Sequence, residues 1–235
     1  MQQLAEEYWG KVDPTDNPIL SAENSPSWLA QASYHSGMFE RGEQEDARLF
    51  LSWIIDQFSQ NVPATRTNAW QAQHQALFQV VLQPFDKCTI CGHVKHRPKE
   101  VETMLNVGVF DTHKTIYEAL QDTLIGKVDG AWCDNCRKTQ AMYRTSDIAA
   151  APEILSIALQ IMLPGGKARH ALKYPEILDL TVCQADSTRP LYYRLNAVVS
   201  HLGEDDAGHY IASVRSREPG RFTAISDNEL ISPTT

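Results

Sequence analysis

The chain has 235 residues, of which 43% are hydrophobic and 21% are charged, a composition typical of a soluble globular protein with one large domain or two small ones. Its formal net charge of −8 disfavours binding to nucleic acid or to an anionic membrane. There is no signal-peptide pattern at the start and no apolar run of membrane-spanning length, so we expect an intracellular protein of the cytoplasm or nucleus.

The first strong pattern lies between residues 39 and 58, after a proline-containing, loop-rich lead-in. Apolar residues recur there at three- and four-residue spacing, which predicts an amphipathic helix; they are Ala47, Phe50, Leu51, Ile54, Ile55 and Phe58. A helix that only packs against the core explains this apolar face. It does not explain the polar residues Gln44 and Asp46 at the start of the helix.

From Phe78 onward the pattern is mainly that of β structure, with one predicted short helix at residues 115–124. The predicted strands and extended segments lie at residues 78–82, 140–144, 154–162 and 174–180. The sequence therefore predicts an α+β protein.

A predicted β-hairpin follows, formed by residues 195–199 and 210–214 around a connection that contains glycine and aspartate. His209 follows Gly208 at the start of the second strand. A loop–strand edge is a frequent position for an active-site base, although a lone histidine in a strand is more often structural.

Four of the five cysteines form two Cys-x-x-Cys pairs, Cys88 with Cys91 and Cys133 with Cys136. Two such pairs supply the four thiolates of a closed, structural zinc site, and we predict one zinc ion that ties together the ends of two β ribbons. Two disulfides or free thiols are the alternatives. His93 and His96 are rival ligands, and a nucleic-acid-binding zinc ribbon is the alternative function, which the acidic chain disfavours.

The motifs in their order along the chain resemble the catalytic domain of the ubiquitin-specific proteases, the papain-like deubiquitinases. Besides the cysteine pairs, the matching segments are residues 42–51, 152–157, 174–180, 193–203 and 208–210. The resemblance implies a single papain-like domain with a partial thumb at about residues 1–75, zinc-tipped fingers at about 76–150 and a palm at about 151–235. It also implies that the partner is ubiquitin or a ubiquitinated protein.

By this resemblance, His209 is the general base that activates a cysteine thiol, and Ser226 orients the imidazole. Asp227 takes the orienting role if the register differs by one residue. Asp46 matches a carboxylate that contacts the basic tail of ubiquitin, and Gln44 and Tyr210 match neighbouring substrate contacts. The family usually has a glutamate where this chain has Leu49.

The chain departs from the family because the box that supplies the nucleophilic cysteine is absent, and no cysteine precedes Cys88. Cys183 lies where the family has no nucleophile. We therefore expect no isopeptide cleavage by the sequence as printed, either because the box lies in a missing segment or because the protein is a ubiquitin-binding pseudoenzyme. A zinc-stabilised interaction domain without a ubiquitin role is the third alternative.

Overall fold

A computed structural model describes residues 32–42, 45–60, 67–163, 166–167, 171–203, 208–216, 220–226 and 229–231. The chain forms two compact units. Unit 1 comprises Met1–Ile54, Ala197–Gly203 and Ala207–Thr235, and unit 2 comprises Ile55–Asn196 and Glu204–Asp206.

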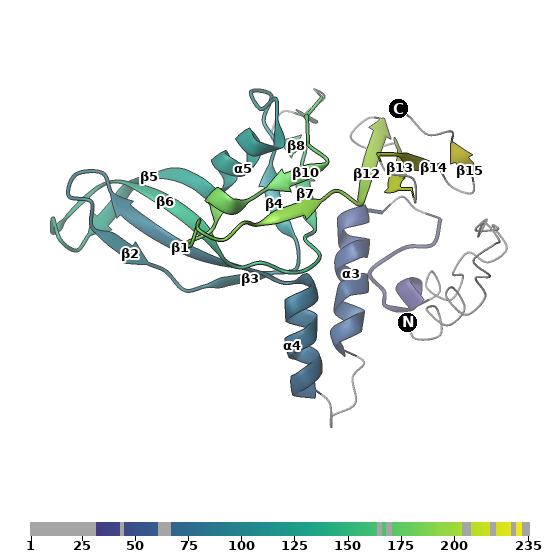
Figure 1. Ribbon diagram of the computed structural model, residues 1–235, viewed down its shortest axis with the longest axis horizontal. Coiled ribbons are helices and arrows are strands. Elements are labelled where there is room, and N and C mark those ends of the chain that lie inside the picture. Colours follow the sequence, from purple (N-terminus) through teal and green to yellow (C-terminus); the bar gives the residue numbers. More distant parts are fainter. Residues whose placement is uncertain are drawn as a thin grey trace. The chain divides into compact units, whose positions relative to one another are not determined.

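Unit 2 is built on a sheet of long antiparallel strands that extends as an arm (Figure 1). Its strand order is β2-β1-β6-β5, and β3 also pairs with β1. The bounds are β1 (Val80–Cys88), β2 (Val94–His96), β3 (Glu100–Glu102), β5 (Ile125–Cys133) and β6 (Lys138–Ala150). The strand predicted at residues 140–144 is part of β6, and the strand predicted at residues 78–82 overlaps β1 only from Val80, since Phe78 ends a helix. Both β1 and β6 extend well beyond the apolar residues that predicted them.

The main core of unit 2 lies at the base of this arm, under α5 (Ile116–Leu124). Ile116, Ala119, Leu120 and Leu124 of the predicted helix are all buried. Thr115 begins the helix with a capping box, in which its hydroxyl accepts the Glu118 backbone N–H while the Glu118 carboxylate accepts the Thr115 N–H.

Short strand pairs complete the described part of unit 2. β4 (Leu105–Gly108) runs parallel to β7 (Ile157–Gln160), which realises part of the strand predicted at residues 154–162. The antiparallel pairs are β8 (Met162–Leu163) with β9 (Gly166–Lys167) and β10 (Ile177–Asp179) with β11 (Tyr192–Arg194), and the 3-10 helix η3 (Thr181–Cys183) lies between β10 and β11.

The predicted amphipathic helix is α3 (Ala47–Gln60), whose residues belong partly to unit 1 and partly to unit 2. In unit 1, Trp53 is buried and forms an aromatic cluster with Phe39 and Phe50, whereas Leu51 is 40% exposed. The three- and four-residue spacing therefore predicted the helix correctly, but it placed Leu51 on the buried face, whereas the side chain is exposed.

The sequence analysis did not predict α4 (Thr67–Phe78). Within unit 2, α4 contacts the end of α3. The buried His74 ring bonds the Ile55 carbonyl at 3.0 Å, and the rings of Phe58 and Phe78 stack at 6.0 Å. The residue that α4 buries against α3 is a histidine, so the apolar residues of this segment form only a weak helical pattern. The apolar spacing that predicts an amphipathic helix was therefore missing.

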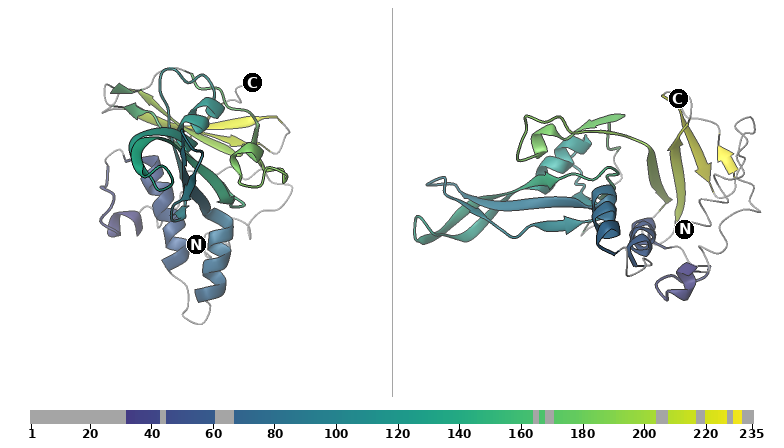
Figure 2. Two further views of the ribbon diagram at one scale, coloured as in Figure 1. Left: turned by 90° about the vertical axis from the view of Figure 1, so that its left-hand side faces the viewer. Right: turned by 60° about the horizontal axis from the view of Figure 1, so that its bottom comes forward.

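The described sheet of unit 1 is an antiparallel meander in the order β12-β13-β14-β15, seen in yellow-green in Figure 2. Its strands are β12 (Ala197–Gly203), β13 (Gly208–Arg215), β14 (Phe222–Ser226) and β15 (Glu229–Ile231). The hairpin predicted from the sequence is the β12–β13 pair, in which Leu202 lies opposite His209.

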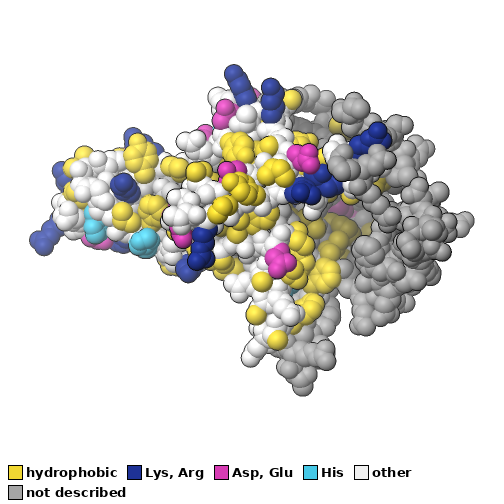
Figure 3. Space-filling view, viewed as in Figure 1, with side chains coloured by type: hydrophobic (Ala, Val, Ile, Leu, Met, Phe, Trp, Pro, Cys, Tyr) yellow, Lys and Arg dark blue, Asp and Glu magenta, His cyan; other side chains and the backbone are white. Residues whose placement is uncertain are grey.

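Among the described residues, no helix is long and apolar enough to cross a membrane. On the face of the molecule in Figure 3, hydrophobic side chains lie between Lys, Arg and His side chains on the arm. Ile90, Trp132 and Tyr143 of the arm are each at least 50% exposed. The exposed surface of the arm is therefore partly apolar and partly basic.

Candidate functional site

The strands of unit 1 bring two of the predicted site residues together. His209 near the start of β13 and Ser226 at the end of β14 lie with the imidazole Nε2 at 2.6 Å from the serine Oγ. Both side chains are half-buried. Because Nε2 is bonded to the hydroxyl, Nδ1 is the ring nitrogen that remains for proton transfer with a nucleophile.

A close approach within the hairpin requires glycine at position 208. A Cβ built there falls far inside contact distance of the His201 ring and the Leu202 carbonyl oxygen. His201 pairs with Tyr210 across the strands, and their ring centroids are 4.9 Å apart. The glycine before His209 thus lets the His201 ring lie across the hairpin end, beside Tyr210.

Asp46 lies at the start of α3, where its carboxylate has two partners in Arg48. Oδ1 accepts the Arg48 backbone N–H at 2.7 Å and so caps the helix. The guanidinium of Arg48 also bonds both carboxylate oxygens, with Nη2 at 2.6 Å from Oδ2. These hydrogen bonds hold the pKa of the Asp46 carboxyl below its ordinary value.

The sequence predicted that Asp46 contacts the substrate, but it did not single out Arg48. The Arg48 guanidinium has a raised pKa, chiefly through Asp46 and to a smaller extent through the nearby Tyr210. Tyr210 is the residue that follows His209 in β13, so Arg48 lies within electrostatic range of that strand. The only sequence signal was a basic residue two positions after the aspartate.

Two other candidates, Gln44 and Asp227, lie outside the described residues. The same holds for the acidic residues at 204–206 between β12 and β13.

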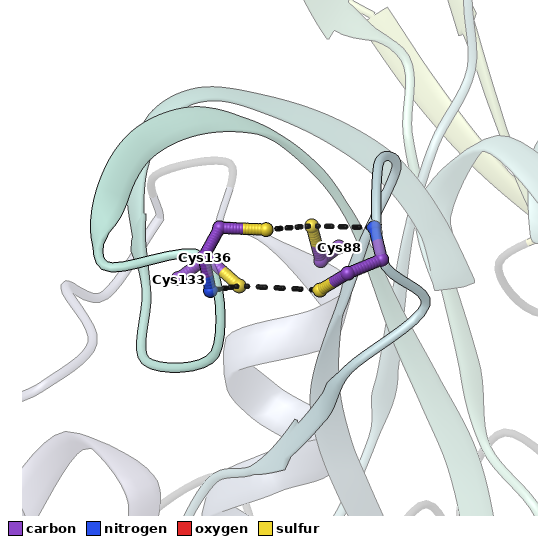
Figure 4. A group of neighbouring side chains, drawn as sticks. Cys88, Cys133 and Cys136 are labelled. Atoms are coloured by element: carbon purple, nitrogen blue, oxygen red, sulfur yellow. Dashed lines mark hydrogen bonds between the residues drawn. The ribbon is translucent and has the colours of Figure 1, made fainter.

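The second feature is a group of four sulfurs at the tip of the arm in unit 2. Cys88 ends β1 and Cys91 lies in the turn that follows, while Cys133 ends β5 and Cys136 lies in the turn before β6. The four sulfurs lie within 4.8 Å of one another. The Sγ atoms of Cys91 and Cys133 are 3.6 Å apart, and those of Cys88 and Cys136 are 4.0 Å apart. Figure 4 shows the sulfurs converging from the two turns.

These distances fit a metal and exclude disulfides. A tetrahedral zinc ion with bonds of about 2.3 Å to sulfur places its sulfurs about 3.8 Å apart, whereas a disulfide needs about 2.05 Å. Backbone N–H groups of Ile90 and Cys136 donate to the sulfurs of Cys88 and Cys133, at 3.3 and 3.4 Å. Such donors stabilise thiolates, the form that binds metal.

The surroundings of the cluster support the same interpretation. Lys95 forms an ion pair with Asp134 at 2.8 Å and so joins the two turns. Among the described residues, the four cysteines are the group whose ligand atoms lie within 4.8 Å of one another. His96, which the sequence offered as a rival ligand, packs against the Phe85 ring instead.

The fifth cysteine, Cys183, lies in η3 of unit 2 and is half-buried. Burial, followed by the charges of Asp179 and Asp147, raises the pKa of its thiol. A thiol that resists deprotonation is a poor nucleophile. All five cysteines belong to unit 2, whereas His209 and Ser226 belong to unit 1.

Comparison with known proteins identifies relatives over most of the chain. The zebrafish (Danio rerio) ubiquitin carboxyl-terminal hydrolase 48 is 28% identical over 217 residues, which are 87% of this chain and 20% of that protein. The Saccharomyces cerevisiae ubiquitin carboxyl-terminal hydrolase 10 is 35% identical over 131 residues, which are 52% of this chain and 16% of that protein. The chain thus spans a fifth or less of the length of these two relatives.

The fold is also found among solved structures. The structure of the SAGA Ubp8/Sgf11/Sus1/Sgf73 DUB module bound to ubiquitin aldehyde matches with a TM-score of 0.69 and 22% identity, over 82% of this chain and 46% of that one. A second structure, of a variant of this module, matches over 99% of this chain and 60% of that one, with a TM-score of 0.70 and 18% identity. The predicted α+β, papain-like deubiquitinase fold is therefore confirmed.

The model of the family described as ubiquitin carboxyl-terminal hydrolase matches residues 2–234. The match covers nearly the whole chain, including the His209 hairpin and both cysteine pairs. The chain therefore belongs to the ubiquitin carboxyl-terminal hydrolase family, as a domain of the ubiquitin-specific protease type.

Proposed function

We propose that this domain recognises ubiquitin and carries the acid–base half of a thiol-dependent deubiquitinase. The contact between His209 and Ser226 carries the proposal, because an imidazole bonded at Nε2 keeps its other nitrogen for a thiol. In this role His209 accepts the thiol proton as general base, and Ser226 holds the ring. A serine hydroxyl stabilises an imidazolium less than a carboxylate does.

Asp46 and Tyr210 are the proposed contacts for the basic tail of ubiquitin. The proposal is supported by Arg48, which pairs with Asp46 and lies within electrostatic range of Tyr210. Tyr210 is the residue that follows the proposed base, His209. The SAGA DUB module that contains Ubp8, whose structure shares this fold, is bound to ubiquitin aldehyde. That complex supports ubiquitin as the partner of this chain as well.

For the metal, we propose a structural zinc ion held by Cys88, Cys91, Cys133 and Cys136. An ion with four protein thiolates has no position for water or substrate, so it would stabilise the arm and take no part in catalysis. Free cysteines and a thiolate metal site suit the reducing cytoplasm or nucleus, where we expect the protein to act.

A second function, a ubiquitin-binding pseudoenzyme, is favoured by one observation. Four of the five cysteines form the metal group, and burial raises the pKa of the remaining thiol, that of Cys183. In this case the printed sequence holds a base and an orienting group without a nucleophile. Covalent catalysis is lost when the nucleophile is missing, whatever the position of the base.

Ubiquitin binding and turnover test both functions together. We expect the purified chain to bind fluorescently labelled ubiquitin and to leave a fluorogenic ubiquitin C-terminal amide intact. His209→Ala should bind as well as the original chain, because a general base acts in the reaction and not in binding. Failure of the folded chain to bind ubiquitin would reject both functions, and turnover by the chain would reject the pseudoenzyme.

A further inference from the structure

We propose that Arg48 is a specificity-determining residue. Its guanidinium binds the Asp46 carboxylate within the chain and so competes with the basic tail of ubiquitin for that carboxylate. This inference rests on the proposed function, because it concerns how the same site selects its ligand. It predicts that the site binds a basic tail less tightly than the presence of Asp46 suggests.

The geometry of the pair is that of a bound ligand. The guanidinium Nε bonds Oδ1 at 3.2 Å and Oδ2 at 3.0 Å, and Nη2 bonds Oδ2 at 2.6 Å. Oδ1 also accepts the backbone N–H of Arg48. A carboxylate held by a guanidinium fork already makes the contact that an arginine of the ligand would make.

The pair is accessible enough for exchange. The side chains of Arg48 and Asp46 are 44% and 35% exposed, so an incoming basic group can reach the carboxylate as Arg48 swings into solvent. Exposed pairs of this kind are weak, which makes Arg48 a competitor that lowers affinity and not a permanent block.

The local charge supports the same conclusion. Asp46 and Arg48 cancel each other, and the next residue, Leu49, is uncharged and 52% exposed. Arg48 also lies within electrostatic range of Tyr210, beside the proposed base. A basic tail therefore meets no net negative charge at this point and gains no long-range attraction from Asp46.

The test is a comparison of ubiquitin affinities at low salt. Arg48→Gln removes the competitor and leaves the Asp46 helix cap in place, since the cap uses the backbone N–H. We expect about a two- to fivefold gain in affinity. Arg189→Gln is the matched control, because Arg189 is an exposed arginine near an aspartate, Asp186, in unit 2.

Asp46→Asn completes a double-mutant cycle, since asparagine keeps the cap while it removes the charge. We expect it to cost little affinity in the original chain and to abolish the gain in the Arg48→Gln background. Arg48→Lys, which keeps the charge without the fork, should give a smaller gain. Ubiquitin that lacks its C-terminal tail should bind the original chain and Arg48→Gln equally.

The outcomes separate this inference from the proposed function. Equal affinity of the original chain and Arg48→Gln, or an equal gain in Arg189→Gln, would overturn the role of Arg48 while leaving ubiquitin recognition in place. Absence of ubiquitin binding by every folded variant would overturn the proposed function, and the inference with it.

Discussion

The Nε2 atom of His209 and the Oγ atom of Ser226 lie 2.6 Å apart in unit 1, where β13 and β14 pair. The two residues are distant in sequence, and the strand pairing brings them together. Their contact links the histidine that follows Gly208 to the residue at the end of β14.

Replacing Ser226 tests the strength of this contact. Ser226→Ala removes the hydroxyl, and we expect the free energy of unfolding to fall by about 1 kcal/mol, the net worth of a partly buried hydrogen bond. Urea denaturation measures the change. Ser226→Thr keeps the hydroxyl and should lose much less; equal losses in the two variants would argue against the bond.

The cysteine cluster predicts about one equivalent of zinc per chain. Cys88→Ser should release the zinc and lower thermal stability, because metal binding adds directly to the free energy of folding. Elemental analysis and thermal unfolding measure the two effects. Cys183→Ser, outside the cluster, should keep its zinc, and a metal-free chain that unfolds at the same temperature would contradict the assignment.

Two strand glycines make a matched pair. Gly208→Ala places a methyl group against the His201 ring and a backbone carbonyl, so we expect it to lower the free energy of unfolding by at least about 2 kcal/mol. Gly126→Ala meets nothing within 4 Å and should be nearly neutral. Similar stability of the two variants in urea would show that the hairpin end is more open than described.

Asp86 predicts a pH dependence of stability. This buried carboxylate bonds Arg144 at 2.8 Å and Arg97 at 2.7 Å, and these bonds, with that of Arg144 the larger cause, lower its pKa from the ordinary 3.8. Because the folded-state pKa is depressed, the stabilisation is present above the unfolded pKa and is lost as the pH falls through the folded value.

Asp86→Asn should therefore lower the free energy of unfolding by about 2–3 kcal/mol at pH 7, since it leaves two guanidinium groups without their counter-charge. The difference between the two proteins should shrink below about pH 4 as the carboxylate is protonated. Denaturation of both proteins across this pH range measures it, and a difference that does not change with pH would exclude the carboxylate charge as the cause.

The sequence allowed the local features to be predicted, but not those that depend on distant contacts. The α5 helix was predicted because its apolar spacing is a local signal, whereas its Thr115 capping box was not recognised in the sequence. The group of four cysteines was predicted because the two residues of each Cys-x-x-Cys pair are close in sequence. In contrast, α4 was missed because its buried residue is His74, whose partner is a carbonyl on another helix.

The same limit applies to the candidate site. The spacing of residues in α3 indicated Asp46 at the start of the helix, but not the orientation of the Arg48 side chain, which depends on cap geometry. The burial of Trp53 depends on Phe39, which lies outside the helix. Periodicity alone placed Leu51 in the core instead.

The central proposal is that His209 and Ser226 serve as base and orienting group for thiol chemistry, and that the sequence as printed supplies no nucleophilic thiol. The most direct test is intact-mass analysis after incubation with ubiquitin that carries a thiol-reactive group at its C-terminus. We predict that the chain binds this probe and that its mass stays unchanged. A covalent adduct that forms with the original chain and disappears in His209→Ala would contradict the claim, because it would mean that a thiol of this chain, such as Cys183, reaches the base.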